Sequence, residues 1–131
     1  MVAESPFASF REVAYARPGR EFPTGPWLGR VFFHPTVDVG FLYVWLRYGW
    51  NMERASPEQG VVGTKTPILL IHGLKDRNIP PCHSDLIQEK NPASIVVWKV
   101  PGAIHTGAHK GAPEGFEQGV LHWFADHSSQ N

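Results

Sequence analysis

The sequence predicts an α/β fold, in which the strands of a mostly parallel sheet alternate with helices. An uninterrupted apolar run at 67–71 (PILLI) is typical of a strand buried on both faces. A second run, rich in β-branched residues, follows at 94–100. Helical patterns follow the two runs, at about 81–90 and 113–125. This strand–helix–strand–helix order is the βαβα unit from which parallel sheets are built.

The first half of the chain is less regular. Val2 and Ala3 suit the tail of a buried strand, and an amphipathic run follows at 7–15. The segment 18–26 is interrupted by prolines and glycines and is predicted to be a loop. Apolar spacings of three and four at 27–51 predict a helix in pieces, with breaks at Pro35 and Gly40. We therefore expect one partial domain over 1–131, with a loop and helical insertion at 18–60 and the βαβα unit at 61–131.

Composition narrows the function classes. Twelve Lys and Arg balance twelve Asp and Glu, which argues against a nucleic-acid partner. The most apolar stretch, 37–50, is interrupted by charged and glycine residues and is too short for a membrane span. The single cysteine, Cys82, fits a reducing compartment, and the first residues lack the pattern of a secretory signal. We expect a cytoplasmic protein, and no motif calls for a cofactor.

An ionisable residue follows each of the two clear strands. Asp76 comes five residues after Ile71, and His105 comes five residues after Val100. Ligands of open α/β sheets bind at the carboxyl ends of strands, and a parallel sheet would place these two loops side by side. An aspartate that reaches a histidine nitrogen fixes its tautomer and stabilises the imidazolium, as in a serine-type triad. His72, at the end of the first strand, is expected to be a structural hydrogen-bonding residue.

The segment 66–108 resembles the last two strands of α/β-hydrolases of the prolyl-oligopeptidase-like and serine-aminopeptidase-like kind. In those families P-x-L-x-I-H-G-x-x-D-x-x-(I/V)-P carries the triad acid, and V-P-G-A-x-H carries the triad histidine. The first motif is found at 67–80 and the second at 100–105. The resemblance implies that Asp76 is the acid and His105 the base of a serine hydrolase acting on a small ester or peptide. Residues 4–7 (ESPF) also resemble the turn after the nucleophile helix in some of these proteins.

The nucleophile of this family precedes the acid and sits in a G-x-S-x-G turn, which the chain lacks. Ser5 and Ser56 are each followed by proline, which has no N–H to offer an oxyanion. Ser9 has bulky neighbours two residues away on both sides. We therefore expect the C-terminal portion of a serine hydrolase that shows little or no turnover alone. Its open sheet edge is expected to favour self-association and poor solubility.

Two other readings remain open. A non-catalytic ligand-binding or interaction module could use the same loops on a degenerate hydrolase fold. A metal hydrolase could use His105, His109 and Asp76 as zinc ligands. Gly107 and Gly111 argue against a helix that carries both histidines on one face.

Overall fold

The computed structural model describes residues 1–16 and 25–128, with the backbone alone for 25–33. It divides into two compact units, which are taken separately below. Unit 1 comprises Met1–Ala8 and Pro57–Asn131, and unit 2 comprises Ser9–Ser56. The expected loop at 18–26 lies mostly outside the described residues.

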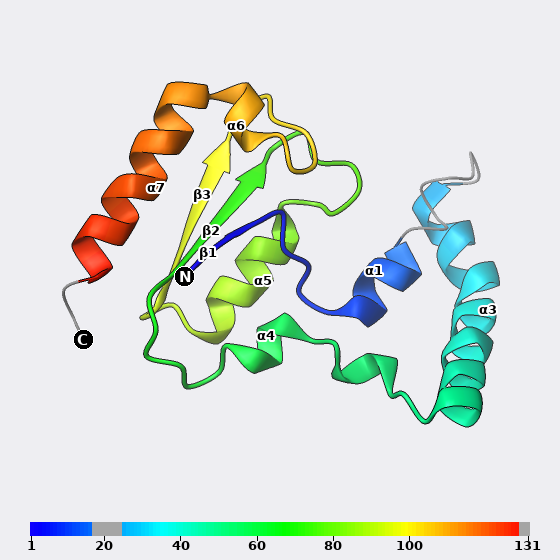
Figure 1. Cartoon of the computed structure of the whole chain (residues 1–131). Helices are drawn as coiled ribbons and strands as arrows, with labels where there is room; N and C mark the ends of the chain where they lie inside the picture. The colour runs from blue at the N-terminus through cyan, green and yellow to red at the C-terminus, as the bar shows by residue number, and fades with distance from the viewer. Residues whose placement is uncertain (17–24, 129–131) are drawn as a thin grey trace. The chain divides into compact units, whose positions relative to one another are not determined.

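Unit 1 contains a three-stranded sheet in the order β1-β2-β3 (Figure 1). Its strands are β1 (Val2–Glu4), β2 (Ile68–Gly73) and β3 (Ile95–Val100). Both pairings are parallel, and the register aligns Gly73 with Val100. The expected α/β class with a parallel sheet is therefore confirmed. Because β2 and β3 end at the same level, the loops that follow them begin side by side.

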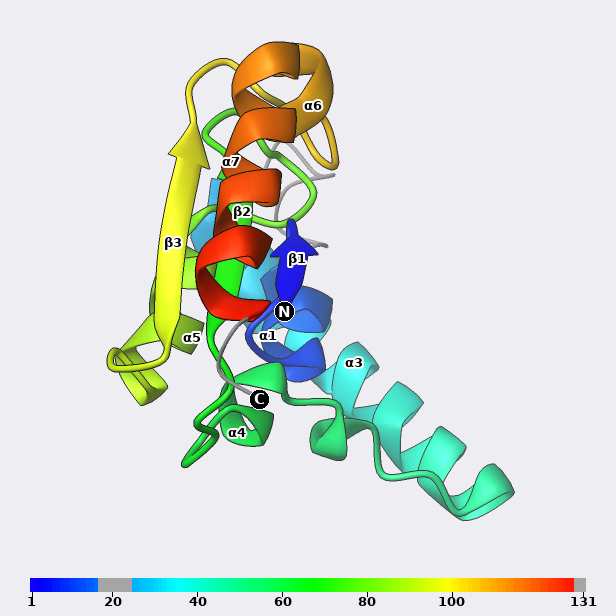
Figure 2. The ribbon, with the colours of Figure 1, turned by 60° about the vertical axis from the view of Figure 1, so that its left-hand side comes forward.

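Helices cover the two faces of this sheet. The helix α5 (Cys82–Lys90) lies on one face, and α6 (Ala108–Gly111) and α7 (Pro113–His127) lie on the other (Figures 1 and 2). Alternate residues of β2 point to opposite faces. Ile68 and Leu70 therefore pack with α5, whereas Leu69 and Ile71 pack toward α7.

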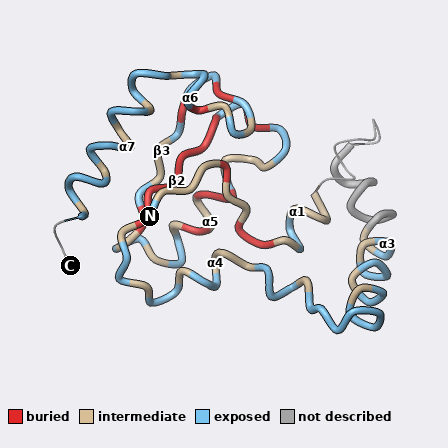
Figure 3. Tube along the Cα trace, viewed as in Figure 1, coloured by how far each residue is buried: buried red, intermediate tan, exposed pale blue. Residues whose placement is uncertain are grey.

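Burial in unit 1 is concentrated along β2, as Figure 3 shows. All six residues of this strand are buried, which is the reason for its continuous apolar sequence. The flanking strands are shorter or more exposed, and β1 and β3 are the two edges of the sheet. Self-association through an edge stays a prediction.

Unit 2 is helical in its described residues. It contains α1 (Phe10–Ala16), α3 (Gly25–Tyr48) and the short 3-10 helix η1 (Met52–Arg54), and the one-turn helix α4 (Pro57–Gly60) follows in unit 1. Aromatic contacts join α1 to α3: the Tyr15 ring lies 4.1 Å from the His34 ring and 6.4 Å from the Phe41 ring. A hydrogen bond from the Tyr15 hydroxyl to Asp38 accompanies them.

The predicted breaks at Pro35 and Gly40 are wrong, because α3 runs through both residues. A proline inside a helix removes one backbone hydrogen bond, and a glycine lowers helix propensity by about 1 kcal/mol. Neither residue forbids a helix, and the ring contacts with α1 help to support this one. Unit 2 overlaps the segment expected to be an insertion, 18–60, but its being inserted in a larger domain stays a prediction. In the described part of the chain, no helix has the length and apolarity to cross a membrane.

Candidate active site

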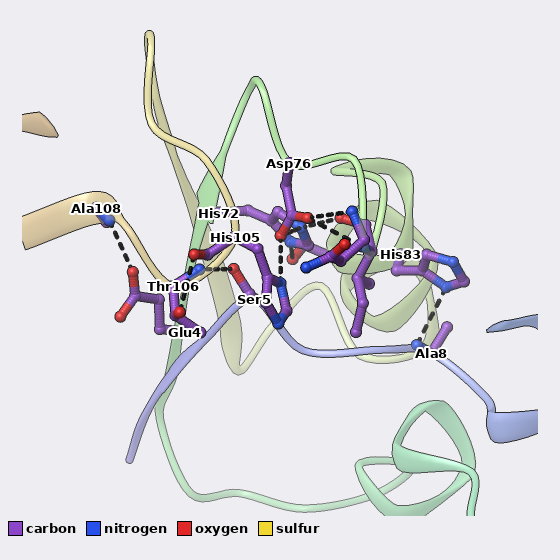
Figure 4. A network of polar contacts seen from close by, with 12 residues as sticks. Glu4, Ser5, Ala8, His72, Asp76, His83, His105, Thr106 and Ala108 are labelled. Atoms are coloured by element: carbon purple, nitrogen blue, oxygen red, sulfur yellow. Dashed lines mark hydrogen bonds and ion pairs between the residues drawn. The ribbon is translucent and has the colours of Figure 1, made fainter. Parts of the chain in front are cut away.

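The loops after β2 and β3 bring Asp76 and His105 together. Asp76 Oδ2 lies 2.8 Å from His105 Nδ1, although the two residues are 29 positions apart in sequence (Figure 4). The aligned strand ends explain this contact, since each loop starts from the same edge of the sheet. The expected adjacency is confirmed, and the catalytic roles of the two residues stay predictions.

The Asp76 side chain is completely buried. Its Oδ1 accepts hydrogen bonds from the backbone N–H groups of Asn78 and Ile79, both at 2.9 Å. Burial by itself raises the pKa of the Asp76 carboxyl, but the Ile79 N–H, His105 and the Ser5 hydroxyl together outweigh it and leave the pKa below its ordinary value. Asp76 is therefore held as a carboxylate that also organises its own turn.

His105 also lines a pocket. Its side chain is 32% exposed, and Nδ1 donates to the carboxylate. Within the described ranges, His105 Nε2 has no hydrogen-bond partner. The pocket has a volume of about 740 Å³ and is lined by Leu74, Lys75, Asp76, Arg77, Asn78, Ile104 and His105. A ligand in this pocket would therefore lie beside the His105 side chain.

The end of β1 holds the histidine loop in place. The Thr106 N–H donates to Ser5 Oγ at 3.1 Å, and the Ala108 N–H donates to Glu4 Oε1 at 2.8 Å (Figure 4). Ser5 and Thr106 both have positive φ angles, 48° and 49°, which are uncommon for residues other than glycine. Three separate segments of the sequence therefore meet at the pair, and the ESPF turn is one of them.

Gly73 allows the two loops to approach each other closely. A Cβ added at this position would lie 2.4 Å from the Ala103 carbonyl oxygen and 2.8 Å from that of Ile104. A side chain at the end of β2 would therefore collide with the backbone that leads to His105. The glycine of the first motif has a steric role.

Sequence reasoning missed how close His72 lies to the pair. This residue, expected to be a structural hydrogen-bonding group, has Nε2 at 3.4 Å from Asp76 Oδ2 and its side chain is fully buried. Its Nδ1 lies 2.6 Å from Ser84 Oγ on α5. The alternation of side chains along β2 could have indicated that His72 points to the same face of the sheet as Ile68 and Leu70. The tertiary position of Ser84 had no comparable signal.

None of the serines whose placement the structure describes donates to His105 Nε2. Ser5 Oγ is buried and accepts from Thr106, and Ser9 Oγ accepts from the Glu12 N–H at 3.2 Å. Ser84 is fully buried against His72. Among the described residues, therefore, no serine is bonded to the histidine of the Asp76–His105 pair.

The three residues of the alternative zinc site, His105, His109 and Asp76, do not all come together. His109 lies in α6, and its Nε2 is 3.3 Å from Glu117 Oε1 instead of facing Asp76. Across 1–16 and 25–128, no three histidine, cysteine or carboxylate side chains are grouped so that they could bind a metal ion.

The Asp76–His105 arrangement can accept and return a proton at Nε2 while the buried carboxylate stabilises the charged ring. No protein-family model matches this chain, and no curated protein or solved structure shows significant similarity to it.

Proposed function

We propose that Asp76 and His105 are the acid and the base of a serine hydrolase site of the α/β-hydrolase type, acting on an ester or peptide bond. The observation that carries this proposal is the 2.8 Å contact between a buried carboxylate and Nδ1 of a histidine that lines a pocket. The position of the pair, after two adjacent parallel strands, agrees with the place where such sheets bind ligands.

In this proposal His105 acts first as a general base and then as a general acid. Nε2 takes the hydroxyl proton of a serine as its oxygen attacks the carbonyl carbon, and it returns that proton to the leaving group. Asp76 keeps the hydrogen on Nδ1, so that Nε2 is the basic nitrogen, and its charge stabilises the imidazolium. The serine itself is expected from a segment outside this sequence, so the 131-residue chain alone should show little or no turnover.

The test reads the codons upstream of Met1 in the same frame. We expect a strand followed by G-x-S-x-G, and the extended protein should react with a fluorophosphonate probe and hydrolyse p-nitrophenyl esters. His105→Ala should abolish both activities, since it removes the base. His109→Ala is the matched control, because this histidine is more than half exposed and does not line the pocket.

One outcome would contradict the proposal, and a second would contradict only the expected inactivity of the chain alone. Upstream codons that encode a stop would leave the chain without its serine, and would favour the non-catalytic ligand-binding module. Ester hydrolysis by the 131-residue chain that His105→Ala abolishes would show that the chain supplies its own nucleophile, so the expected inactivity would be wrong.

A further inference from the structure

His72 occupies the interior of unit 1 between the Asp76 loop and α5. Its Nδ1 lies 2.6 Å from Ser84 Oγ, and its Nε2 lies 2.8 Å from the carbonyl oxygen of Ile79. A carbonyl oxygen can only accept, so Nε2 must carry a hydrogen. The neutral tautomer then leaves Nδ1 to accept from the Ser84 hydroxyl. Both ring nitrogens are engaged, which fixes the orientation of the ring.

His72 and Asp76 both bond to the backbone of Ile79, through the two peptide groups on either side of its Cα. The Ile79 carbonyl accepts from His72 Nε2, while the N–H of the same residue donates to Asp76 Oδ1 at 2.9 Å. The other carboxylate oxygen, Oδ2, receives His105 Nδ1 and also lies 3.4 Å from His72 Nε2. A continuous series of contacts therefore leads from α5 to the pocket, and Figure 4 labels three of its members, His72, Asp76 and His105. It passes through Ser84, His72, Ile79, Asp76 and His105.

Ser84, His72 and Asp76 follow each other in the order of a serine triad. Ser84 is nevertheless completely buried, as is His72, so its hydroxyl cannot reach a substrate. The same contact has a different use. It keeps the His72 ring turned so that Nε2–H points toward Ile79 and the carboxylate.

We propose that His72 is a positioning residue for the Asp76–His105 pair, which it aligns by holding the backbone of Ile79 on one side and lying beside the Asp76 carboxylate on the other. The catalytic role of the pair rests on the proposed function, whereas its alignment by His72 does not. A purely structural His72 would affect stability alone. A positioning His72 must also change the state of the Asp76 carboxylate when it is replaced.

The test follows two NMR signals in the full chain: the pH titration of the Asp76 carboxyl carbon and the resonance of the hydrogen on His105 Nδ1. In His72→Leu the Ile79 carbonyl loses its donor, so the Ile79 backbone is free to shift and its N–H is no longer held against Asp76 Oδ1. We expect the pKa of Asp76 to rise toward its ordinary value of 3.8 and the Nδ1–H resonance to shift or broaden. His72→Gln should recover part of both signals, because its side-chain amide can still donate to the Ile79 carbonyl.

Ile87→Ala is the matched control. Ile87 lies on the same helix as Ser84, is 1% exposed and packs with Ile68 and Leu70. This variant should lose stability and leave the Asp76 titration unchanged. The inference is wrong if Ile87→Ala moves the titration as far as His72→Leu does, or if His72→Leu leaves both signals in place.

Ser84→Ala covers the case in which His72→Leu does not fold. It removes one hydroxyl and leaves the imidazole, so a smaller rise in the pKa of Asp76 is expected, and no rise would contradict the inference. Hydrolysis by the extended protein remains a separate readout. If the extended protein shows no hydrolysis but the Asp76 titration changes in His72→Leu as expected, the proposed function is wrong and the positioning role of His72 still holds.

Discussion

The two units of the molecule differ in how they bury their side chains. Unit 1 packs apolar side chains onto both faces of its sheet, and the whole of β2 is buried. In unit 2, Ser9 is the only buried residue among the side chains that the structure describes. Large apolar residues of α3 are exposed there, including Tyr43, Trp45 and Leu46. The difference teaches that α3 stays regular even where its described side chains, from His34 onward, are not buried, whereas the candidate site follows strands that are packed on both faces.

The largest expected effect compares the same substitution in the two units. Leu70→Ala removes a side chain that is 2% exposed, and it should lower the free energy of unfolding by about 2–5 kcal/mol. Leu46→Ala truncates a leucine that is 69% exposed, and it should change that free energy by less than about 0.5 kcal/mol. Urea denaturation of both variants measures the difference. Equal losses would mean that unit 2 has a core of its own.

A pair of glycine substitutions should give opposite signs. Gly73→Ala forces a Cβ against the Ala103 carbonyl, and we expect a loss of about 1–3 kcal/mol together with displacement of the His105 loop. Gly40→Ala places its Cβ in open space on α3, and it should stabilise the helix by up to about 1 kcal/mol. Denaturation and the His105 Nδ1–H resonance read out the two effects. A Gly73→Ala protein with wild-type stability would contradict the close approach of the two loops.

The smallest expected effect is the pH dependence of the free energy of unfolding, to which the two units contribute in different pH ranges. At acid pH the contribution comes from Asp76 in unit 1. The pKa of Asp76 is lowered in the folded chain, because the Ile79 N–H, His105 and Ser5 outweigh the opposing effect of burial. As the pH falls below about 4, the Asp76 carboxyl is protonated in the unfolded chain before it is protonated in the folded chain. The stability that the carboxylate provides above that pH is therefore lost as the pH falls through the folded pKa. Asp76→Asn should flatten this part of the profile. Urea midpoints at pH 5 and pH 3 test it, and an unchanged slope would count against an ionised Asp76.

At alkaline pH, the change in the free energy of unfolding is expected to come from Tyr15 in unit 2. The hydrogen bond to Asp38, with burial and the Asp38 charge, raises the pKa of Tyr15 above 10.0, although Arg11 opposes the shift. The stability that this provides is complete below pH 10 and is lost as the pH rises through the folded pKa. Tyr15→Phe should remove that loss and leave the acid side unchanged. A change of the acid side in Tyr15→Phe would show that the two units are coupled.

The regular elements of unit 1 could be predicted closely from the sequence. The run at 67–71 and the strand expected at 94–100 correspond to β2 and β3, with boundaries within two residues. Their helices, expected at 81–90 and 113–125, correspond to α5 and α7. Side chains buried on both faces leave an uninterrupted apolar pattern, and that pattern is local in sequence. Helix α3 was predicted in pieces, because proline and glycine preferences give only local costs that packing can outweigh.

The sequence by itself determined the parallel α/β unit and the two candidate residues at its strand ends, because strand periodicity and the positions of Asp76 and His105 are local properties. Only the tertiary structure decided what surrounds the pair. Ser84 meets His72, Ser5 meets Thr106, and the backbone of Ile79 bonds to both His72 and Asp76. These contacts join segments that the chain keeps apart. They depend on the register of the sheet and the path of each loop, which no local pattern encodes.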